Sequence, residues 1–226
     1  MKKIFFVSTL AGILTLLVYN FRTPPKAKPS SSPQPETRDN NTLSTIAQEG
    51  DIIFQTSTSS QSLAIQLATK SPYSHVGVIY KNQKGLFVFE AVHPVKMTKL
   101  DAWVKSGKDG KYVLKRLKNS SSLLTNETLE KMKTAGEKYI GKKYDSHFEW
   151  SDERMYCSEL VWKLYKESTG IEICATKKLS DFDLTHPEVI QIMKKRYIDK
   201  IPLNETVVSP NDIFISDQLV TVLTSD

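Results

Sequence analysis

Cys157 is the residue of this sequence best suited to covalent chemistry, because a cysteine thiolate is a strong nucleophile. Polar residues precede it, and the apolar pattern that follows predicts a helix over residues 158–169, ended by Gly170. A cysteine at a helix start lies at the positive end of the helix dipole, which lowers the pKa of a thiol. Cys157 is therefore a candidate nucleophile, the alternative being a small buried cysteine at a helix end.

His75 is the candidate general base. It precedes an apolar run over residues 76–80 that is typical of a core strand. A histidine entering such a strand can direct its imidazole at the start of a neighbouring helix. There it would take the thiol proton and later protonate the leaving group. A purely structural histidine is the alternative.

Glu90 lies inside a second apolar run, residues 86–92, where a carboxylate needs a partner to offset its desolvation. We expect the two runs to form a hairpin, so Glu90 could accept a hydrogen bond from His75 and fix the ring. A salt bridge to a lysine or an edge position is the alternative for Glu90. His93 is a rival for the same role, on the opposite face of a regular strand.

Tyr144 follows the helix stop at Gly141, and its hydroxyl could polarise a substrate carbonyl near the thiolate. An aromatic packing role is the alternative. The sequence has no G-x-S-x-G elbow, no Gly-rich phosphate loop and no H-E-x-x-H motif, so we expect no cofactor. One acidic and histidine-containing cluster has a spacing that fits no metal site: Asp145, His147, Glu149, Asp152 and Glu153.

The two cysteines, Cys157 and Cys174, are not expected to form a disulfide. The predicted helix after Cys157 is roughly 18 Å long. The few residues left to return to Cys174 span at most about 15 Å when extended. A disulfide needs Cα atoms within about 7 Å, so Cys157 should be a free thiol.

The chain divides by composition into three parts. Residues 1–22 carry Lys2 and Lys3 before an apolar run, which indicates an export signal or signal anchor. Residues 23–47 are rich in proline and serine and form the expected linker. Residues 48–226 form the expected hydrolase domain, with folding beginning near Thr42 to Gly50. We therefore expect an exported protein of the periplasm or cell envelope. The N-terminal segment could also associate it with a membrane.

The composition is that of a globular protein, with 39% hydrophobic and 25% charged residues. The formal net charge of +6 comes from lysines dispersed among acids, so we expect no nucleic-acid partner. Nothing in the sequence indicates an oligomeric state. Hairpin strands with separate helices predict an α+β fold. Expected strands are 52–54, 76–80, 86–92, 112–117, 207–215 and 219–223; expected helices are 62–69, 100–105, 126–140, 158–169 and 187–197, the last opened by a Thr185/Glu188 capping box.

Four segments together resemble the YiiX/YebB-like hydrolases, which are circularly permuted relatives of the NlpC-type cell-wall peptidases. They are residues 50–54, 74–78, 141–145 and 156–161, and residues 209–213 resemble the closing segment of that group. The order, with the histidine before the cysteine, is that of the permuted group. The resemblance covers residues 50–215 and implies a papain-like fold with a small antiparallel sheet packed on helices.

The resemblance also implies roles: Cys157 as nucleophile, His75 as base, Glu90 orienting the histidine and Tyr144 near the oxyanion. It implies hydrolysis of an amide through a thioester acyl-enzyme, with cell-wall peptides as the first expected substrate. Lipid ester hydrolysis or acyl transfer on the same scaffold is one alternative. A catalytically inactive domain that binds peptide or lipid at the envelope is the other. Residues 176–204 do not match the family closely, so the resemblance does not define the pocket wall or the substrate.

Overall fold

The computed structural model describes residues 42–198 and 200–225. The expected export segment and most of the expected linker lie outside the described residues. Residues 42–46 are helical, and Leu43 among them is 1% exposed, so ordered structure begins before the domain boundary expected at residue 48. Within the described ranges, no helix is both long enough and apolar enough to cross a bilayer.

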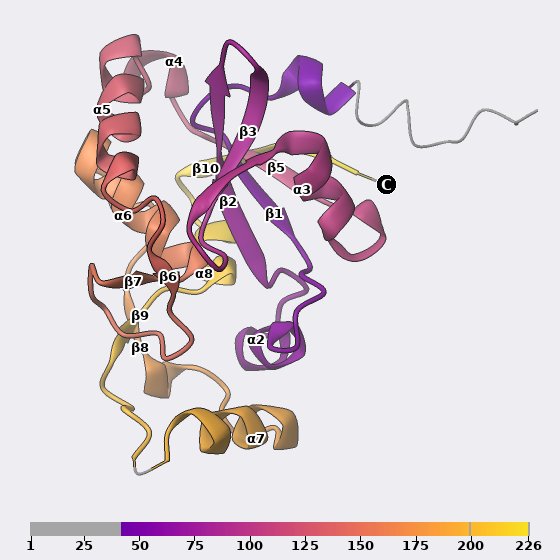
Figure 1. Cartoon of the computed structure of the whole chain (residues 1–226), viewed down its shortest axis with the longest axis vertical. Coiled ribbons are helices and arrows are strands. Elements are labelled where there is room, and N and C mark those ends of the chain that lie inside the picture. The colour runs from indigo at the N-terminus through magenta and orange to yellow at the C-terminus, as the bar shows by residue number, and fades with distance from the viewer. Residues whose placement is uncertain (1–41, 199, 226) are drawn as a thin grey trace, which may run out of the picture. The chain divides into compact units, whose positions relative to one another are not determined.

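The centre of the fold is an antiparallel sheet of six strands in the order β10-β5-β1-β2-β3-β4 (Figure 1). β2 and β3 form the predicted hairpin, with Val78 opposite Phe89. This register confirms the α+β prediction and places the end of β3 beside the start of β2. The strands are β1 Ile52–Gln55, β2 His75–Asn82, β3 Gly85–Glu90, β4 Lys96–Lys99, β5 Val113–Leu117 and β10 Leu219–Thr224.

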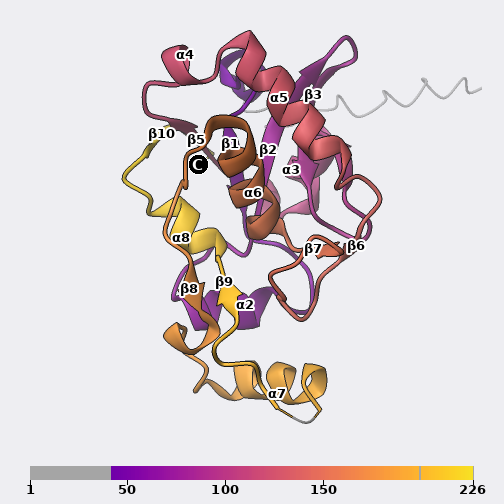
Figure 2. The same ribbon diagram turned by 90° about the vertical axis from the view of Figure 1, so that its left-hand side faces the viewer.

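Helices cover both faces of this sheet (Figure 2). On one face α6 packs its apolar side against β1 and β2, with Leu160 and Leu164 meeting Val76 and Val78 in a first core. The other face carries a second core around Trp103 of α3. The helices are α2 Ser62–Thr69, α3 Leu100–Ser106, α4 Ser120–Leu123, α5 Asn126–Glu137, α6 Cys157–Thr169, α7 Pro187–Arg196 and α8 Pro210–Phe214, with short 3₁₀ turns at Lys108–Gly110 and Leu179–Asp181.

A third apolar cluster lies where α2 and α7 pack together, away from the main sheet (Figure 1). Ala64 of α2 meets Val189 and Met193 of α7 there, and Leu179 closes the cluster. Two pairs of short strands connect this region to the rest of the fold: β6 (Lys143–Tyr144) with β7 (Arg154–Met155), and β8 (Lys177–Lys178) with β9 (Thr206–Val207).

The strand expected over residues 207–215 is wrong. The strand β9 ends at Val207, and α8 begins at Pro210. Ser209 accepts a hydrogen bond from the Asp212 N–H at 3.1 Å, and the Asp212 carboxylate accepts one from the Ser209 N–H at 2.9 Å. This reciprocal cap, with proline at the first helical position, favours a helix over the predicted strand.

The Thr185/Glu188 capping box is also wrong, although the helix it was expected to open is present. His186 is the N-cap of α7. The Thr185 hydroxyl donates to Asp183 at 2.6 Å, and Glu188 pairs with Nδ1 of His186 at 2.5 Å. The expectation that the cysteines are unbridged is confirmed, because both Cys157 and Cys174 are free thiols.

Candidate active site

His75 is the first residue of β2, where it lies opposite Gln55 of β1 and is 7% exposed. Its ring stacks on Trp103 with centroids 5.9 Å apart. Two residues later, a Cβ at Gly77 would lie 2.4 Å from a Val88 methyl and 2.9 Å from the Phe89 carbonyl oxygen. Glycine therefore lets β3 approach β2 closely at the point where His75 is held.

Glu90 ends β3 on the same side of the sheet as His75, and it is 5% exposed. Its Oε2 lies 2.6 Å from Nε2 of His75 and accepts the indole N–H of Trp103 at 2.9 Å. Its Oε1 accepts the hydroxyl of Thr98 at 2.5 Å. Three donors thus hold the carboxylate, and the carboxylate in turn fixes the imidazole ring.

The pKa values of His75 and Glu90 shift so that both groups carry charge. Burial acts to lower the pKa of His75, but hydrogen bonds and charge interactions with Cys157 and Glu90 raise it to about 10. Burial acts to raise the pKa of Glu90, but His75, Thr98 and Trp103 together lower it below its ordinary value. At neutral pH the imidazole therefore favours the protonated form, which is the state left after it accepts a thiol proton.

Cys157 is the first residue of α6 and is 3% exposed. It lies close enough to His75 to affect the imidazole pKa through a side-chain hydrogen bond. Since Nε2 of His75 bonds Glu90, the ring nitrogen left for the sulfur is Nδ1. The start of α6 is anchored by the Ser158 hydroxyl, which donates to the Val208 carbonyl at 2.7 Å.

Tyr144 lies in β6, which pairs with β7 just before α6 and so brings the phenol near Cys157. Its oxygen accepts a hydrogen bond from Nε2 of Gln61 at 2.7 Å. Burial, followed by the charge of Cys157, raises the pKa of Tyr144. The phenol therefore keeps its proton, which can point toward a substrate oxygen.

All four predicted site residues thus come together, whereas the rival reading with His93 as the partner of His75 does not hold. His93 is exposed and is not the partner of His75. In the acidic cluster, Asp145 instead accepts the backbone N–H groups of His147 and Glu149 at 2.8 and 2.7 Å. Across the described residues, no group of three or more His, Cys, Asp or Glu side chains is placed to hold a metal ion.

Sequence reasoning missed Trp103 and Thr98, the two further donors to Glu90, and Gln61, the partner of Tyr144. Trp103 lies in a segment that was correctly predicted to be a helix, but nothing local to the sequence links it to Glu90. Thr98 belongs to β4, a strand that was not expected. The sheet register, with Glu90 opposite Lys96, brings Thr98 next to the carboxylate, and the packing of α3 brings Trp103 there.

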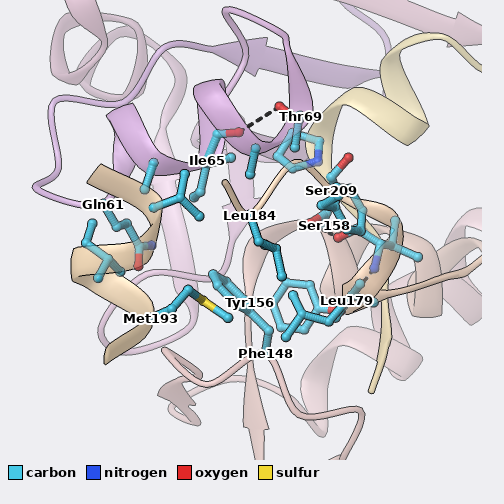
Figure 3. A pocket seen from close by; sticks show the side chains of 18 of the residues that line it. Gln61, Ile65, Thr69, Phe148, Tyr156, Ser158, Leu179, Leu184, Met193 and Ser209 are labelled. Carbon is cyan, nitrogen blue, oxygen red and sulfur yellow. Dashed lines mark hydrogen bonds between the residues drawn. The ribbon is translucent and has the colours of Figure 1, made fainter. Parts of the chain in front are cut away.

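An apolar pocket with a cavity volume of about 90 Å³ opens beside Cys157. Figure 3 shows Ile65 of α2, Leu184 from the loop before α7 and Met193 of α7 around this pocket. Tyr144 and Ser158 line it close to the sulfur. The third cluster supplies part of the wall, and Leu184 and Met193 belong to the segment 176–204 that the resemblance did not cover closely.

Known proteins are similar to this chain in sequence and in fold. Residues 46–223 match the family described as permuted papain-like amidase enzymes, YaeF/YiiX, C92 family. The chain is 49% identical over 175 residues to the uncharacterised protein YiiX of Escherichia coli K12, covering 77% of this chain and 85% of that protein. A crystal structure from E. coli O157:H7, titled metalloprotein yiiX, matches with a TM-score of 0.76 and 48% identity, over 80% of this chain and 98% of that one.

These matches confirm the predicted YiiX-like resemblance and the permuted papain-like fold, with His75 before Cys157 in the chain. The family match spans the sheet, α6 and the pocket walls. The chain therefore belongs to the permuted papain-like amidases of the C92 family, and it is a papain-like cysteine amidase.

Proposed function

We propose that this protein hydrolyses amides whose acyl part is an apolar chain, through a thioester on Cys157. The pocket beside Cys157 carries this proposal, because most of the side chains in its wall are aliphatic or aromatic. An alkyl chain gains free energy on entering such a pocket, at about 0.8 kcal/mol for each buried CH₂ group. Polar or charged groups lose hydration against the apolar part of this wall without gaining partners.

The proposed reaction begins when the Cys157 thiolate attacks the amide carbonyl carbon, with His75 holding the proton. In this proposal the backbone N–H of Cys157, at the start of α6, and the Tyr144 hydroxyl donate to the oxyanion. His75 then protonates the departing amine as the C–N bond breaks. In the second half it takes a proton from water, which attacks the thioester and releases the acid.

Cell-wall stem peptides are the second candidate substrate, favoured by the export segment and linker that the sequence predicts. Such peptides carry several charged groups and no long alkyl chain, whereas most of the pocket wall is apolar. Transfer of the acyl group to another acceptor, or hydrolysis of an ester, would use the same thioester. We accordingly expect an acyl-amide substrate of the cell envelope and an envelope location.

The test compares the full-length chain with its Cys157→Ala and His75→Ala variants on simple N-acyl amides of increasing chain length and on a muramyl stem peptide. We expect kcat/KM to rise about fourfold for each added CH₂ until the pocket is full. Both variants should lose at least about 10³-fold in activity. Ala68→Leu, which narrows the pocket, should depress only the long-chain rates, so the short-chain substrate is its internal control.

Mass spectrometry of the intact protein during turnover should detect an added acyl group on wild-type protein and none on Cys157→Ala. Faster cleavage of the stem peptide than of every acyl amide would move the second candidate to first place. A thiol that neither acylates nor reacts with iodoacetamide would instead support the inactive binding domain.

A further inference from the structure

Arg196, the last residue of α7, lines the same pocket as Cys157. Its side chain is partly buried, and its Nη2 donates to Oε1 of Gln61 at 2.5 Å. The guanidinium carbon lies 5.1 Å from the centroid of the Phe148 ring. Within the part of the chain that the structure describes, no carboxylate lies within ion-pair distance of this guanidinium.

This arrangement is costly unless a ligand completes it. A guanidinium loses hydration when buried. An aromatic face, one neutral hydrogen bond and the more distant charge of Asp145 offset only part of that loss, since burial still lowers the pKa of Arg196. Arginine carries five N–H donors in a planar fork that matches a carboxylate or phosphate in two parallel hydrogen bonds. The neighbouring Lys194 and Lys195 are exposed, and of these three basic residues at the end of α7 Arg196 is the one that lines the pocket.

Gln61 connects this arginine to the proposed reaction centre. Its amide oxygen accepts from Arg196, and its amide nitrogen donates to the Tyr144 hydroxyl at 2.7 Å. Tyr144 is the proposed donor to the oxyanion, so Arg196 is one side chain removed from the group that would contact the carbonyl. A substrate bound at Cys157 can therefore place a nearby anionic group against the arginine.

We propose that Arg196 binds a carboxylate or phosphate of the substrate, so that the amides cleaved are acyl amides with an anionic group on the amine side. N-acyl amino acids supply the carboxylate, and N-acylated phosphoethanolamine lipids supply the phosphate. This inference rests on the proposed acyl-amide hydrolysis and narrows its substrate class. Arg196 is then a specificity-determining residue, with the guanidinium binding the substrate directly.

The test uses full-length protein and three substrates with one acyl chain: N-dodecanoylglycine, N-dodecanoylglycinamide and N-dodecanoylphosphoethanolamine. Wild-type protein should prefer one of the anionic amides over the neutral glycinamide by about 10- to 100-fold in kcat/KM. Arg196→Gln should remove that preference, so that kcat/KM falls more on the anionic amides than on the neutral glycinamide. Arg196→Lys, which keeps the charge and loses the fork, should restore part of it. Lys195→Gln is the matched control and should behave as wild type.

The outcomes separate the possible sources and roles. A preference for the glycine derivative assigns a carboxylate, and a preference for the phosphoethanolamine derivative assigns a phosphate. Equal losses on neutral and anionic amides in Arg196→Gln would show a structural role through Phe148 and Gln61, and would overturn the inference. If wild type cleaves only neutral amides, the inference fails and the proposed function stands.

A wild type that cleaves none of the three removes the proposed function, and binding then tests Arg196 separately. Calorimetric titration of Cys157→Ala with dodecanoate and dodecyl phosphate, beside the same protein carrying Arg196→Gln, gives that measurement. Loss of binding by about tenfold or more with Arg196→Gln supports the anion site, and unchanged affinity for both probes overturns it.

Discussion

At the scale of single residues, Cys157 and Glu90 together hold His75 protonated. Glu90 is among the groups that raise the pKa of His75 to about 10, and its own partners keep it ionised. The departing amine needs a proton from the imidazolium, so activity should fall on the alkaline side as His75 loses its proton.

Glu90→Gln removes this charge while keeping the size of the side chain. We expect the alkaline limb of the kcat/KM profile to move to lower pH, because the pKa of His75 falls, and kcat to drop about 10- to 100-fold. Thr98→Val removes one hydrogen bond to Glu90 and keeps the charge of Glu90. The alkaline limb of its kcat/KM profile should therefore stay near that of wild type. An unmoved limb in Glu90→Gln would assign that limb to another group.

The predicted site residues could be found from sequence because each breaks a local pattern. Glu90 is a carboxylate inside an apolar strand, and Cys157 and His75 begin apolar elements. Arg196 and Gln61 break no pattern, since each is an ordinary polar residue at a helix end. Their roles depend on how α2 and α7 pack, and the sequence carries no local signal of that packing.

At the scale of elements, α6 carries a buried carboxylate only two residues after the nucleophile. Glu159 is fully buried, and burial raises its pKa to about 7 despite an ion pair with Lys163 at 2.8 Å. Between the two pKa values, a carboxyl group with a raised pKa binds more protons in the folded chain than in the unfolded chain. The contribution of Glu159 to the free energy of unfolding therefore falls as pH rises from about 4.5 to about 7.

Glu159→Gln should remove this fall. We expect the variant to gain stability relative to wild type as pH rises through that interval, and the difference to become constant above it. Urea unfolding followed by circular dichroism at several pH values measures the difference directly. Glu153→Gln, at an exposed position in the loop before β7, should follow the wild-type curve. A wild-type-like pH dependence in Glu159→Gln would show that Lys163 keeps Glu159 ionised throughout.

Elements with strong local signals were predicted, and those set by competing signals were not. The β2–β3 hairpin follows from two apolar runs joined by a turn at Asn82 and Gly85, and Gly170 ends α6 as expected. The apolar residues of 207–215 favoured a strand, yet the Ser209 cap and Pro210 outweigh them. That capping signal is present in the sequence as Ser209, Pro210 and Asp212.

At the scale of the whole molecule, a single sheet separates two cores, and the site spans both. Cys157 comes from the helix on the first core, whereas His75 and Glu90 are held by Trp103 from the second. The pairing of Cys157 with His75 therefore depends on the sheet staying packed on both faces. A loss of packing far from the sulfur, on the α3 side, should lower stability and with it the fraction of competent enzyme.

Leu43→Ala tests this dependence, because Leu43 closes the second core from the helical residues 42–46. Removing a fully buried leucine side chain should lower the free energy of unfolding by about 2–5 kcal/mol, since the lost contacts leave a cavity. Leu123→Ala, at a position 38% exposed in α4, is the matched control and should cost less than about 0.5 kcal/mol. Urea unfolding of the full-length chain measures both. Equal, small costs would mean that residues 42–46 rest on the fold without supporting it, and the folded domain would then begin at β1.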